Sequence, residues 1–245
     1  MSPRATLATA VRVLAQLRRD PRTLALLLVV PCVLVVLVDQ LLADRPDLFQ
    51  QVGVPLLGLF PLISMFLVTS ITMLRERTSG TLERLLTLPL EKLDILLGYA
   101  IAFAAVAAVQ ATIVSLVGFG LLDLTVVNTE VLVVLLAVAN AVLGMALGLF
   151  LSAFARTEFQ AVQFMPAFLL PQILLCGLLV PRDQMAEWLQ WVSAVLPMTY
   201  AYDALSRAAS DTSLGWRFVL DVVVVLGVTL VALVLGAATL KRRTP

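Results

Sequence analysis

Residues 75–94 read RERTSGTLERLLTLPLEKLD, and they form the one long internal segment of this chain that is rich in charge. Long apolar runs lie on both sides, so we expect the segment to sit in water between two membrane spans. Ser79 can cap a short helix, and Leu82, Leu85 and Leu86 have the i, i+3, i+4 spacing of one helical face. The pattern predicts an amphipathic helix on a membrane face, which either presses on a soluble partner or lies on lipid headgroups.

The composition is typical of an integral membrane protein. Apolar residues make up 61% of the 245 and charged residues 13%, and the mean hydropathy is +1.02. The sequence has no Gly-x-x-x-x-Gly-Lys-Ser/Thr phosphate-binding loop, so we do not expect this chain to hydrolyse ATP or to be an enzyme. It has no histidine, and we predict no metal site. Cys32 and Cys176 lie in apolar runs and are interpreted as packing thiols, with their redox state left open.

Residues 1–245 are expected to form a single all-α membrane domain with six transmembrane helices. The predicted spans cover residues 23–42, 54–74, 93–122, 130–154, 159–180 and 218–240. Residues 75–92 form the charged segment after the second span, and residues 181–215 form an outer segment before the last span.

The pattern of apolar and basic residues in residues 1–22 predicts an amphipathic elbow helix along the inner membrane surface. One helical face carries apolar Leu7, Ala10, Leu14 and Leu17, whereas Arg12, Gln16 and Arg19 lie on another. A secretory signal is the alternative, and the absence of a clear cleavage site with small residues disfavours it.

Prolines mark irregular stretches in the second half of the chain. Pro166 and Pro171 interrupt the fifth predicted span, so this helix is expected to bend. The outer segment carries an apolar stripe that ends at Pro197 and several interfacial aromatic residues, which predicts one or two short helices dipping into the outer leaflet.

The fourth span holds Gly144 and Gly148, a spacing that lets another helix approach closely. We expect that contact to lie within the subunit, with a contact between subunits as the alternative.

Basic residues predict the orientation of the chain in the membrane. By this topology, 13 of the 17 Lys and Arg residues lie on the side of the two termini. The positive-inside rule therefore favours a multi-pass protein of the bacterial plasma (inner) membrane with both termini in the cytoplasm.

Two motifs carry a resemblance to a known family. Residues 75–89 follow Arg-Glu-Arg-x-x-Gly-Thr-Leu-Glu-Arg-Leu-Leu-x-x-Pro, and residues 196–205 follow Leu-Pro-x-Thr-Tyr-x-x-Asp-Ala-Leu. The first closely resembles the segment after the second span in permease subunits of type 2 ATP-binding cassette exporters, and the second matches the usual end of their re-entrant helices. The resemblance covers nearly the full chain. It implies that residues 75–92 hold a cytoplasmic coupling helix, which docks on a separate ATPase subunit; an ordinary interfacial turn is the alternative.

The resemblance also implies residues for two sites. Contact with the ATPase is expected from Glu76, Gly80, Thr81, Leu82, Glu83 and Arg84, with a second, smaller contact at Arg156, Thr157 and Glu158. The second and fifth spans are expected to line the pathway, with candidates Ser64, Met65, Phe66, Thr69, Gln163, Phe164, Phe168 and Gln172. Ordinary helix packing is the alternative for each pathway candidate. Gly80 is expected to hold a backbone conformation that a bulkier residue resists, and no catalytic residue is predicted.

The predicted function is export of an amphipathic drug, lipid or lipid-linked molecule, of the kind found in multidrug efflux. The resemblance implies a working unit of two permeases, either two copies or two paralogues, and two ATPase subunits that carry ATP and magnesium. Nucleic acid is not an expected partner. Asp39, Glu130 and Asp221 lie near predicted span ends, so charges are nearly absent from the span centres, which disfavours an ion-coupled carrier. A secondary carrier and a non-transporting anchor subunit are the alternatives, and a membrane-embedded enzyme is disfavoured because there are no clustered carboxylates.

Overall fold

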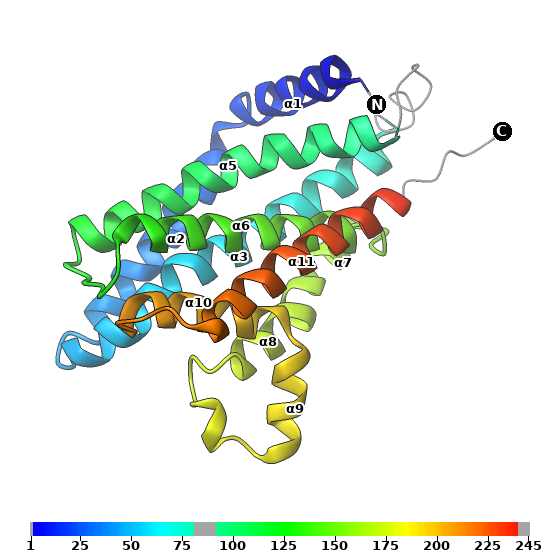
Figure 1. The fold of residues 1–245 in the computed structure, drawn as a ribbon. Coiled ribbons are helices and arrows are strands. Elements are labelled where there is room, and N and C mark those ends of the chain that lie inside the picture. Colours follow the sequence, from blue (N-terminus) through cyan, green and yellow to red (C-terminus); the bar gives the residue numbers. More distant parts are fainter. Residues whose placement is uncertain (1, 81–91, 240–245) are drawn as a thin grey trace.

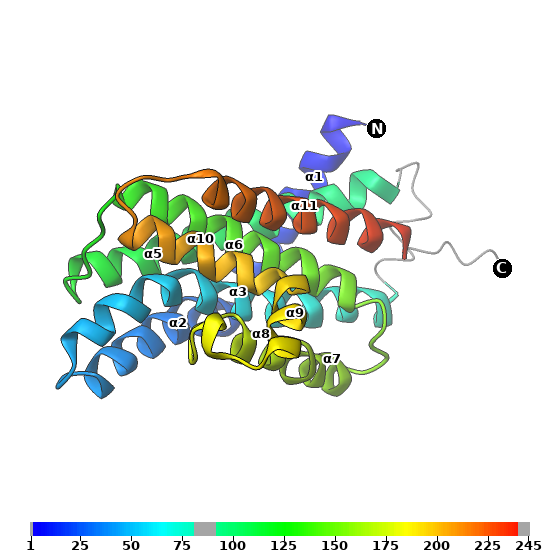
Figure 2. The ribbon, with the colours of Figure 1, turned by 60° about the horizontal axis from the view of Figure 1, so that its bottom comes forward.

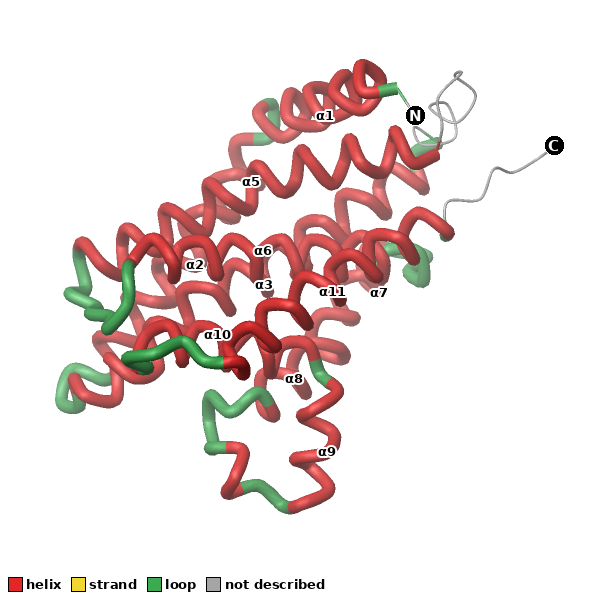
Figure 3. Tube along the Cα trace, viewed as in Figure 1, coloured by secondary structure: helices red, strands yellow, loops and turns green. Residues whose placement is uncertain are grey.

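The computed structural model describes residues 2–80 and 92–239, and the regular elements in these ranges are all helices (Figures 1 and 3). In chain order they are α1 (Pro3–Arg18), α2 (Pro21–Leu41), α3 (Pro46–Thr78), α5 (Lys92–Gly120), α6 (Glu130–Leu151), α7 (Glu158–Phe164), the π-helix η1 (Met165–Leu169), α8 (Leu170–Leu175), the 3-10 helix η2 (Arg182–Gln184), α9 (Glu187–Val195), α10 (Pro197–Ser210) and α11 (Trp216–Ala238). The predicted all-α class is confirmed for the described residues.

Several helices begin where the local chemistry favours a start. Proline lacks an amide N–H, and the first helical position is where that donor is not needed. Aspartate and threonine side chains also cap first turns, since Asp20 accepts from the Thr23 amide in α2 and Thr129 from the Leu132 amide in α6. Four helices have proline as their first residue: Pro3 in α1, Pro21 in α2, Pro46 in α3 and Pro197 in α10.

Within residues 2–80 and 92–239, five helices have the length and apolar composition of a membrane span: α2, α3, α5 from Asp94, α6 and α11. The count of six spans stays a prediction, because residues 159–180 form no single long helix. They divide into α7, η1 and α8, with Pro166 inside the π-helix. The predicted interruption at Pro166 is confirmed as a π-helix, and the bend of this helix stays a prediction.

The helix that holds the second predicted span begins before that span. α3 begins at Pro46 and runs for 33 residues, so it contains residues 54–74 and extends beyond them at both ends. Proline at the first position and Asp47 in the first turn favour this early start. Gly53 and Pro55 do not break the helix. Gly53 packs closely on the Leu124 side chain, which would have to shift to make room for a β-carbon.

The centre of the bundle is the pair α3 and α6, which lie side by side (Figures 1 and 2). Gly144 and Gly148 make this close approach possible. A β-carbon at Gly144 would overlap the Leu62 carbonyl, and one at Gly148 would overlap Thr69 and the Phe66 backbone. The prediction that these glycines pack within the subunit is therefore confirmed.

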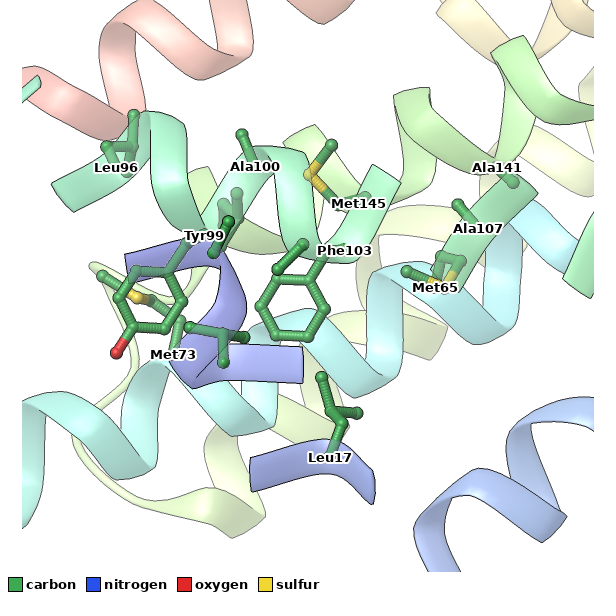
Figure 4. Close-up of a cluster of buried hydrophobic side chains, with 14 of the residues drawn as sticks. Leu17, Met65, Met73, Leu96, Tyr99, Ala100, Phe103, Ala107, Ala141 and Met145 are labelled. Carbon is green, nitrogen blue, oxygen red and sulfur yellow. The ribbon is translucent and has the colours of Figure 1, made fainter. Parts of the chain in front are cut away.

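α1, α2 and α5 cover one side of the central pair, and α1 runs along α5 (Figure 1). Figure 4 shows the apolar cluster that joins them, in which Leu17 of α1 lies near Phe103 of α5 and residues of α3. The predicted N-terminal helix forms, but its apolar residues divide between two faces. Ala10 and Leu17 are buried with Val13, whereas Leu7 is exposed. Its role as an elbow on the membrane stays a prediction.

α10 and α11 cover the other side of the central pair (Figures 1 and 2). The predicted short helices of residues 181–215 are observed as η2, α9 and α10, and the chain changes direction at Pro197 as expected. α9 projects from the bundle in Figure 1. Its exposed face carries Trp188, Trp191 and Val195, which suits an interfacial position.

Candidate functional site

The coupling segment leaves the bundle at the end of α3. Gly80 follows this end with a φ of +71°, in the left-handed region, so its predicted special backbone conformation is confirmed. Thr81, Leu82, Glu83 and Arg84 lie outside the described residues. Their contact with an ATPase therefore stays a prediction, as does that of Gly80.

Glu76 is placed inside the bundle, under α1, and only 7% of its surface is exposed. Its Oε1 accepts a hydrogen bond from Gln16 Nε2 at 3.3 Å. Arg12 lies beside it, with 3.9 Å between Nη2 and Glu76 Oε2. Arg12 donates to the Tyr99 hydroxyl and lies 5.6 Å from the centre of the Tyr99 ring. Arg12 and Gln16 of α1 thus face α3 and α5.

A second polar contact fixes the start of α1 on α5. The Asp94 carboxylate accepts from the Ser2 amide at 3.1 and 3.2 Å and from the Thr6 hydroxyl at 3.3 Å. It fills the place of an N-cap for α1, although it comes from another helix. A few residues further on, Gly98 lets the α1 backbone approach, because a β-carbon there would overlap Thr9.

An ion pair joins the ends of two segments that the resemblance assigns to the ATPase-facing side. Arg75 donates to both carboxylate oxygens of Glu158, at 2.7 Å from Nε and 2.9 Å from Nη2. Arg75 lies one turn before the end of α3, and Glu158 is the first residue of α7. Hydrogen bonding from the Arg75 guanidinium lowers the pKa of the Glu158 carboxyl. Both side chains are exposed, so the ion pair contributes little to stability. Its effect is to hold the end of α3 beside the start of α7.

The pathway candidates on α3 are mostly packed inside this chain. Met65, Phe66 and Thr69 are fully buried. The Thr69 hydroxyl donates within α3 to Met65 O at 2.7 Å and lies 3.2 Å from Met145 O of α6. Ser64 is half-buried and donates to Pro61 O at 3.1 Å.

The candidates on the broken helix divide by position. Gln172 is buried and accepts from the Met198 amide at 3.4 Å, which ties α8 to α10. Gln163 is exposed and, with half-buried Phe164, lines a cavity of about 410 Å³ that Arg156 also lines. Phe168 is 36% exposed and stacks on Phe66, with 6.2 Å between ring centres. The pathway candidates on α3 thus contact those on the broken helix through the Phe66 and Phe168 rings.

Sequence reasoning missed one buried polar connection that the structure makes plain. Pro31 inside α2 has no N–H, so the Leu27 carbonyl loses its helical donor. Gln110 of α5, fully buried, donates to that carbonyl at 2.8 Å and also bonds the Ser64 hydroxyl. The available signals were a proline and a lone glutamine in two apolar runs. Their pairing could not be read from the sequence.

Comparison with known proteins gives the family context. Residues 4–209 match the family model described as ABC-2 type transporter. A probable multidrug ABC transporter permease, YbhR of Escherichia coli, is 30% identical over 177 residues, which cover 71% of this chain and 48% of the relative. The linearmycin resistance permease protein LnrN of Bacillus subtilis is 27% identical over 69% of this chain and 43% of its own length.

Another relative is the ABC transporter G family member 20 of Dictyostelium discoideum. It is 29% identical over 138 residues, which cover 56% of this chain and 19% of the relative. The matched part of this chain thus spans about half or less of each of these relatives.

Proposed function

The chain belongs to the ABC-2 type transporter family, and from that membership we propose that it forms the membrane pathway of an exporter driven by a separate ATPase subunit. The observation that carries the proposal is the Arg75–Glu158 pair. It joins the end of α3, from which the coupling segment leaves, to the start of the broken helix α7–η1–α8. A push on the coupling segment would reach both elements at once.

The broken helix supplies an element that can change shape. A π-helix with an internal proline has fewer regular backbone hydrogen bonds than an α-helix, so it bends at lower cost. The Phe66–Phe168 contact links it to α3, next to the predicted pathway residues. We propose that movement of this element opens the pathway.

The substrate class follows from two supports. YbhR is named a probable multidrug ABC transporter permease, and LnrN is named a linearmycin resistance permease protein. The described spans place few charges near their centres, which suits an amphipathic drug, lipid or lipid-linked molecule better than an ion or sugar. A second permease, a copy or a paralogue, completes the pathway, and ATP with magnesium binds the ATPase.

Affinity purification from the native membrane tests the proposal. A Walker-type ATPase should copurify with the tagged chain, and Glu83→Ala with Arg84→Ala should lower the permease-stimulated ATPase rate while membrane insertion stays intact. Asp183→Ala with Arg217→Ala, a pair of the same charges in and near the outer segment, is the matched control and should leave stimulation unchanged. Unchanged stimulation in the Glu83 and Arg84 variant contradicts the assigned contact. Absence of any ATPase under mild detergent favours a carrier or an anchor.

A further inference from the structure

A cavity of about 410 Å³ lies beside the start of the broken helix. Its volume is in the range of small-molecule sites. The stretch that lines it lies at the end of the bundle where α3 ends, because Glu158 within that stretch contacts Arg75. By the predicted topology, this end faces the cytoplasm. The lining residues come from the loop after α6, from α7 and from η1: Phe154, Arg156, Gln160, Gln163, Phe164 and Ala167.

The charge of this cavity is positive. Among the described residues that line it, Arg156 is the one with a charge. Its side chain is exposed and has no hydrogen bond or ion pair within the part of the chain that the structure describes. The charge of Glu158, two residues further on, is already offset by Arg75, which donates to both carboxylate oxygens. The cavity therefore presents an unpaired guanidinium group, which favours a negatively charged ligand.

Two amide side chains add hydrogen-bond donors to the cavity. Gln160 and Gln163 are both exposed and lie three residues apart, on one face of α7. Gln160 Oε1 accepts from the Arg156 backbone N–H at 2.8 Å, and the Thr157 hydroxyl accepts from the Gln160 backbone N–H at 3.2 Å. These two bonds hold the loop that carries Arg156 against the first turn of α7. The Nε2 groups of both glutamines have no acceptor among the described residues, so they can donate to a ligand.

The rest of the lining is mainly aromatic. Phe154 is 57% exposed, and its ring packs edge-on against Phe150 of α6 with 5.3 Å between ring centres. Phe164 is half-buried and packs in the apolar cluster that includes Leu74 of α3. Apolar rings beside a basic side chain suit the boundary between headgroups and acyl chains, where binding combines apolar burial with attraction to anionic lipids. A small anion in water would make no use of these rings, whereas a lipid packs its chains on them.

We propose that this cavity binds the phosphate headgroup of an anionic lipid of the inner leaflet. The Arg156 guanidinium pairs with the phosphate, and the Gln160 and Gln163 amides donate to its remaining oxygens. An acyl chain packs on Phe154 and Phe164. A basic pocket on the cytoplasmic side, next to a leaflet that holds anionic lipids, has the chemistry and the location for this ligand. The inference goes beyond the proposed function, since the binding requires neither an ATPase nor transport.

Photolabelling of the full chain in phosphatidylcholine nanodiscs tests the proposal. The probe is a phosphatidylglycerol with a photoreactive group on its acyl chain, and the matched probe has a phosphatidylcholine headgroup on the same chain. We expect saturable labelling of residues 154–167 by the phosphatidylglycerol probe. Half-saturation should be about tenfold weaker for the phosphatidylcholine probe, because its ammonium group meets a guanidinium and no carboxylate. Labelling that does not saturate, or that is equal for the two probes, overturns the proposal.

Three variants test the residues. Arg156→Gln removes the unpaired charge and should raise the half-saturation concentration of the phosphatidylglycerol probe about tenfold. Gln163→Glu keeps the size, adds a carboxylate to the lining and should also weaken binding, so it decides the matter if the Arg156 variant does not fold. Arg22→Gln removes the same charge from an exposed position at the start of α2 and should bind as the unaltered chain does. Equal half-saturation for the Arg156 and Arg22 variants contradicts the site, since general attraction between lipids and basic residues would then explain the labelling.

Two further measurements separate this lipid from other ligands of Arg156. Excess inorganic phosphate should not displace the probe, because phosphate has no chain to pack on the rings, and displacement would overturn the lipid assignment. The resemblance also implies an ATPase contact at Arg156. An Arg156→Gln chain that labels normally but no longer retains its ATPase would assign the cavity to that contact and overturn the proposal. The nanodisc assay contains no ATPase, so loss of lipid binding alone leaves the proposed export function standing.

Discussion

Single small or polar residues set the distances between helices in this bundle. Gly144 lets α6 lie against the α3 backbone, and Gln110 replaces the donor that Pro31 removes from α2. Apolar association adds little between helices in a lipid environment, so such close contacts and hydrogen bonds carry much of the specificity. Substitutions at these positions should act through packing or through an unpaired carbonyl.

Gly144→Ala should destabilise the protein, because the added methyl group meets the Leu62 carbonyl and the two central helices must separate. We expect a loss of about 1–3 kcal/mol in the free energy of unfolding, as for other overpacked interiors. Gly227→Ala in α11 is the control, since nothing lies within 4 Å of the added atom. Thermal unfolding in detergent measures both, and equal midpoints for the two variants would contradict the close packing.

Gln110→Leu should leave the Leu27 carbonyl without a donor in an apolar interior. The expected cost is roughly 1–3 kcal/mol, the range for a buried polar group that loses its partner. Gln51→Leu, at an exposed position of α3, makes the same chemical change without that loss. Denaturation of both variants in the same detergent is the measurement. A Gln110 variant as stable as the Gln51 variant would show that the hydrogen bond from Gln110 to the Leu27 carbonyl does not stabilise the protein.

The residue scale also shows where sequence reasoning fails. The conformation of Gly80 and the packing role of Gly144 were predicted correctly, since both depend on what a glycine permits locally. The resemblance assigns Glu76 to the ATPase contact, and that contact stays a prediction, while the structure places α1 over this carboxylate. A charge pattern does not reveal which neighbouring helix will cover a residue.

At the scale of elements, apolar runs and prolines predicted most helices well. The bounds of α2, α5, α6 and α11 differ from the predicted spans by at most three residues. The fifth span was less predictable, because its division into α7, η1 and α8 depends on how backbone groups freed by two prolines are bonded. α9 and α10 followed from Pro197, whose position at the start of a helix is a local property.

The α3–α7 connection should matter more for coupling than for stability. Arg75→Gln, Glu158→Gln and the double variant should each lower stimulation of the ATPase, and the two single losses should not add, because both remove one contact. Arg45→Gln, exposed in the loop before α3 on the predicted outer side, is the control for charge. If the loss of ATPase stimulation in the double variant equals the sum of the losses in the two single variants, the two residues act separately.

The same pair gives a pH dependence in acid. Arg75 lowers the pKa of Glu158, so the stabilising contribution is complete above the ordinary carboxyl pKa and is lost as pH falls through the lowered value. The contribution should be below about 1 kcal/mol, because the pair is exposed. Unfolding midpoints of the unaltered chain and Glu158→Gln should therefore converge as pH falls through this window, and a difference that persists in strong acid would contradict the assignment.

At the scale of the whole molecule, the distribution of charge determines the expected orientation. Most Lys and Arg residues lie at the ends of the chain, in residues 75–92 and at Arg156. The fold agrees with a common side for these segments, since Arg75 contacts Glu158 and α1 covers the end of α3. α9, with its exposed aromatic side chains, projects from the side of the bundle (Figure 1).

Cysteine labelling tests this orientation. In a chain with Cys32→Ala and Cys176→Ala, a cysteine at exposed Ser213 should react with a membrane-impermeant maleimide in intact spheroplasts, because it lies on the predicted outer side. A cysteine at exposed Ser79 should react after permeabilisation alone. The reverse pattern would place both termini outside and refute the predicted topology.

The hydroxyl groups of α3 have a consequence for how the chain is made. α3 leaves the ribosome well before α6, its main partner, so it must wait in the bilayer with its polar side chains uncovered. Ser64, Thr69 and Ser70 each donate to a carbonyl of their own helix, at Pro61, Met65 and Leu67. These donors are therefore satisfied before any neighbour arrives. When α6 arrives, the Met145 carbonyl comes to lie 3.2 Å from the Thr69 hydroxyl, which then shares its single proton between the two helices.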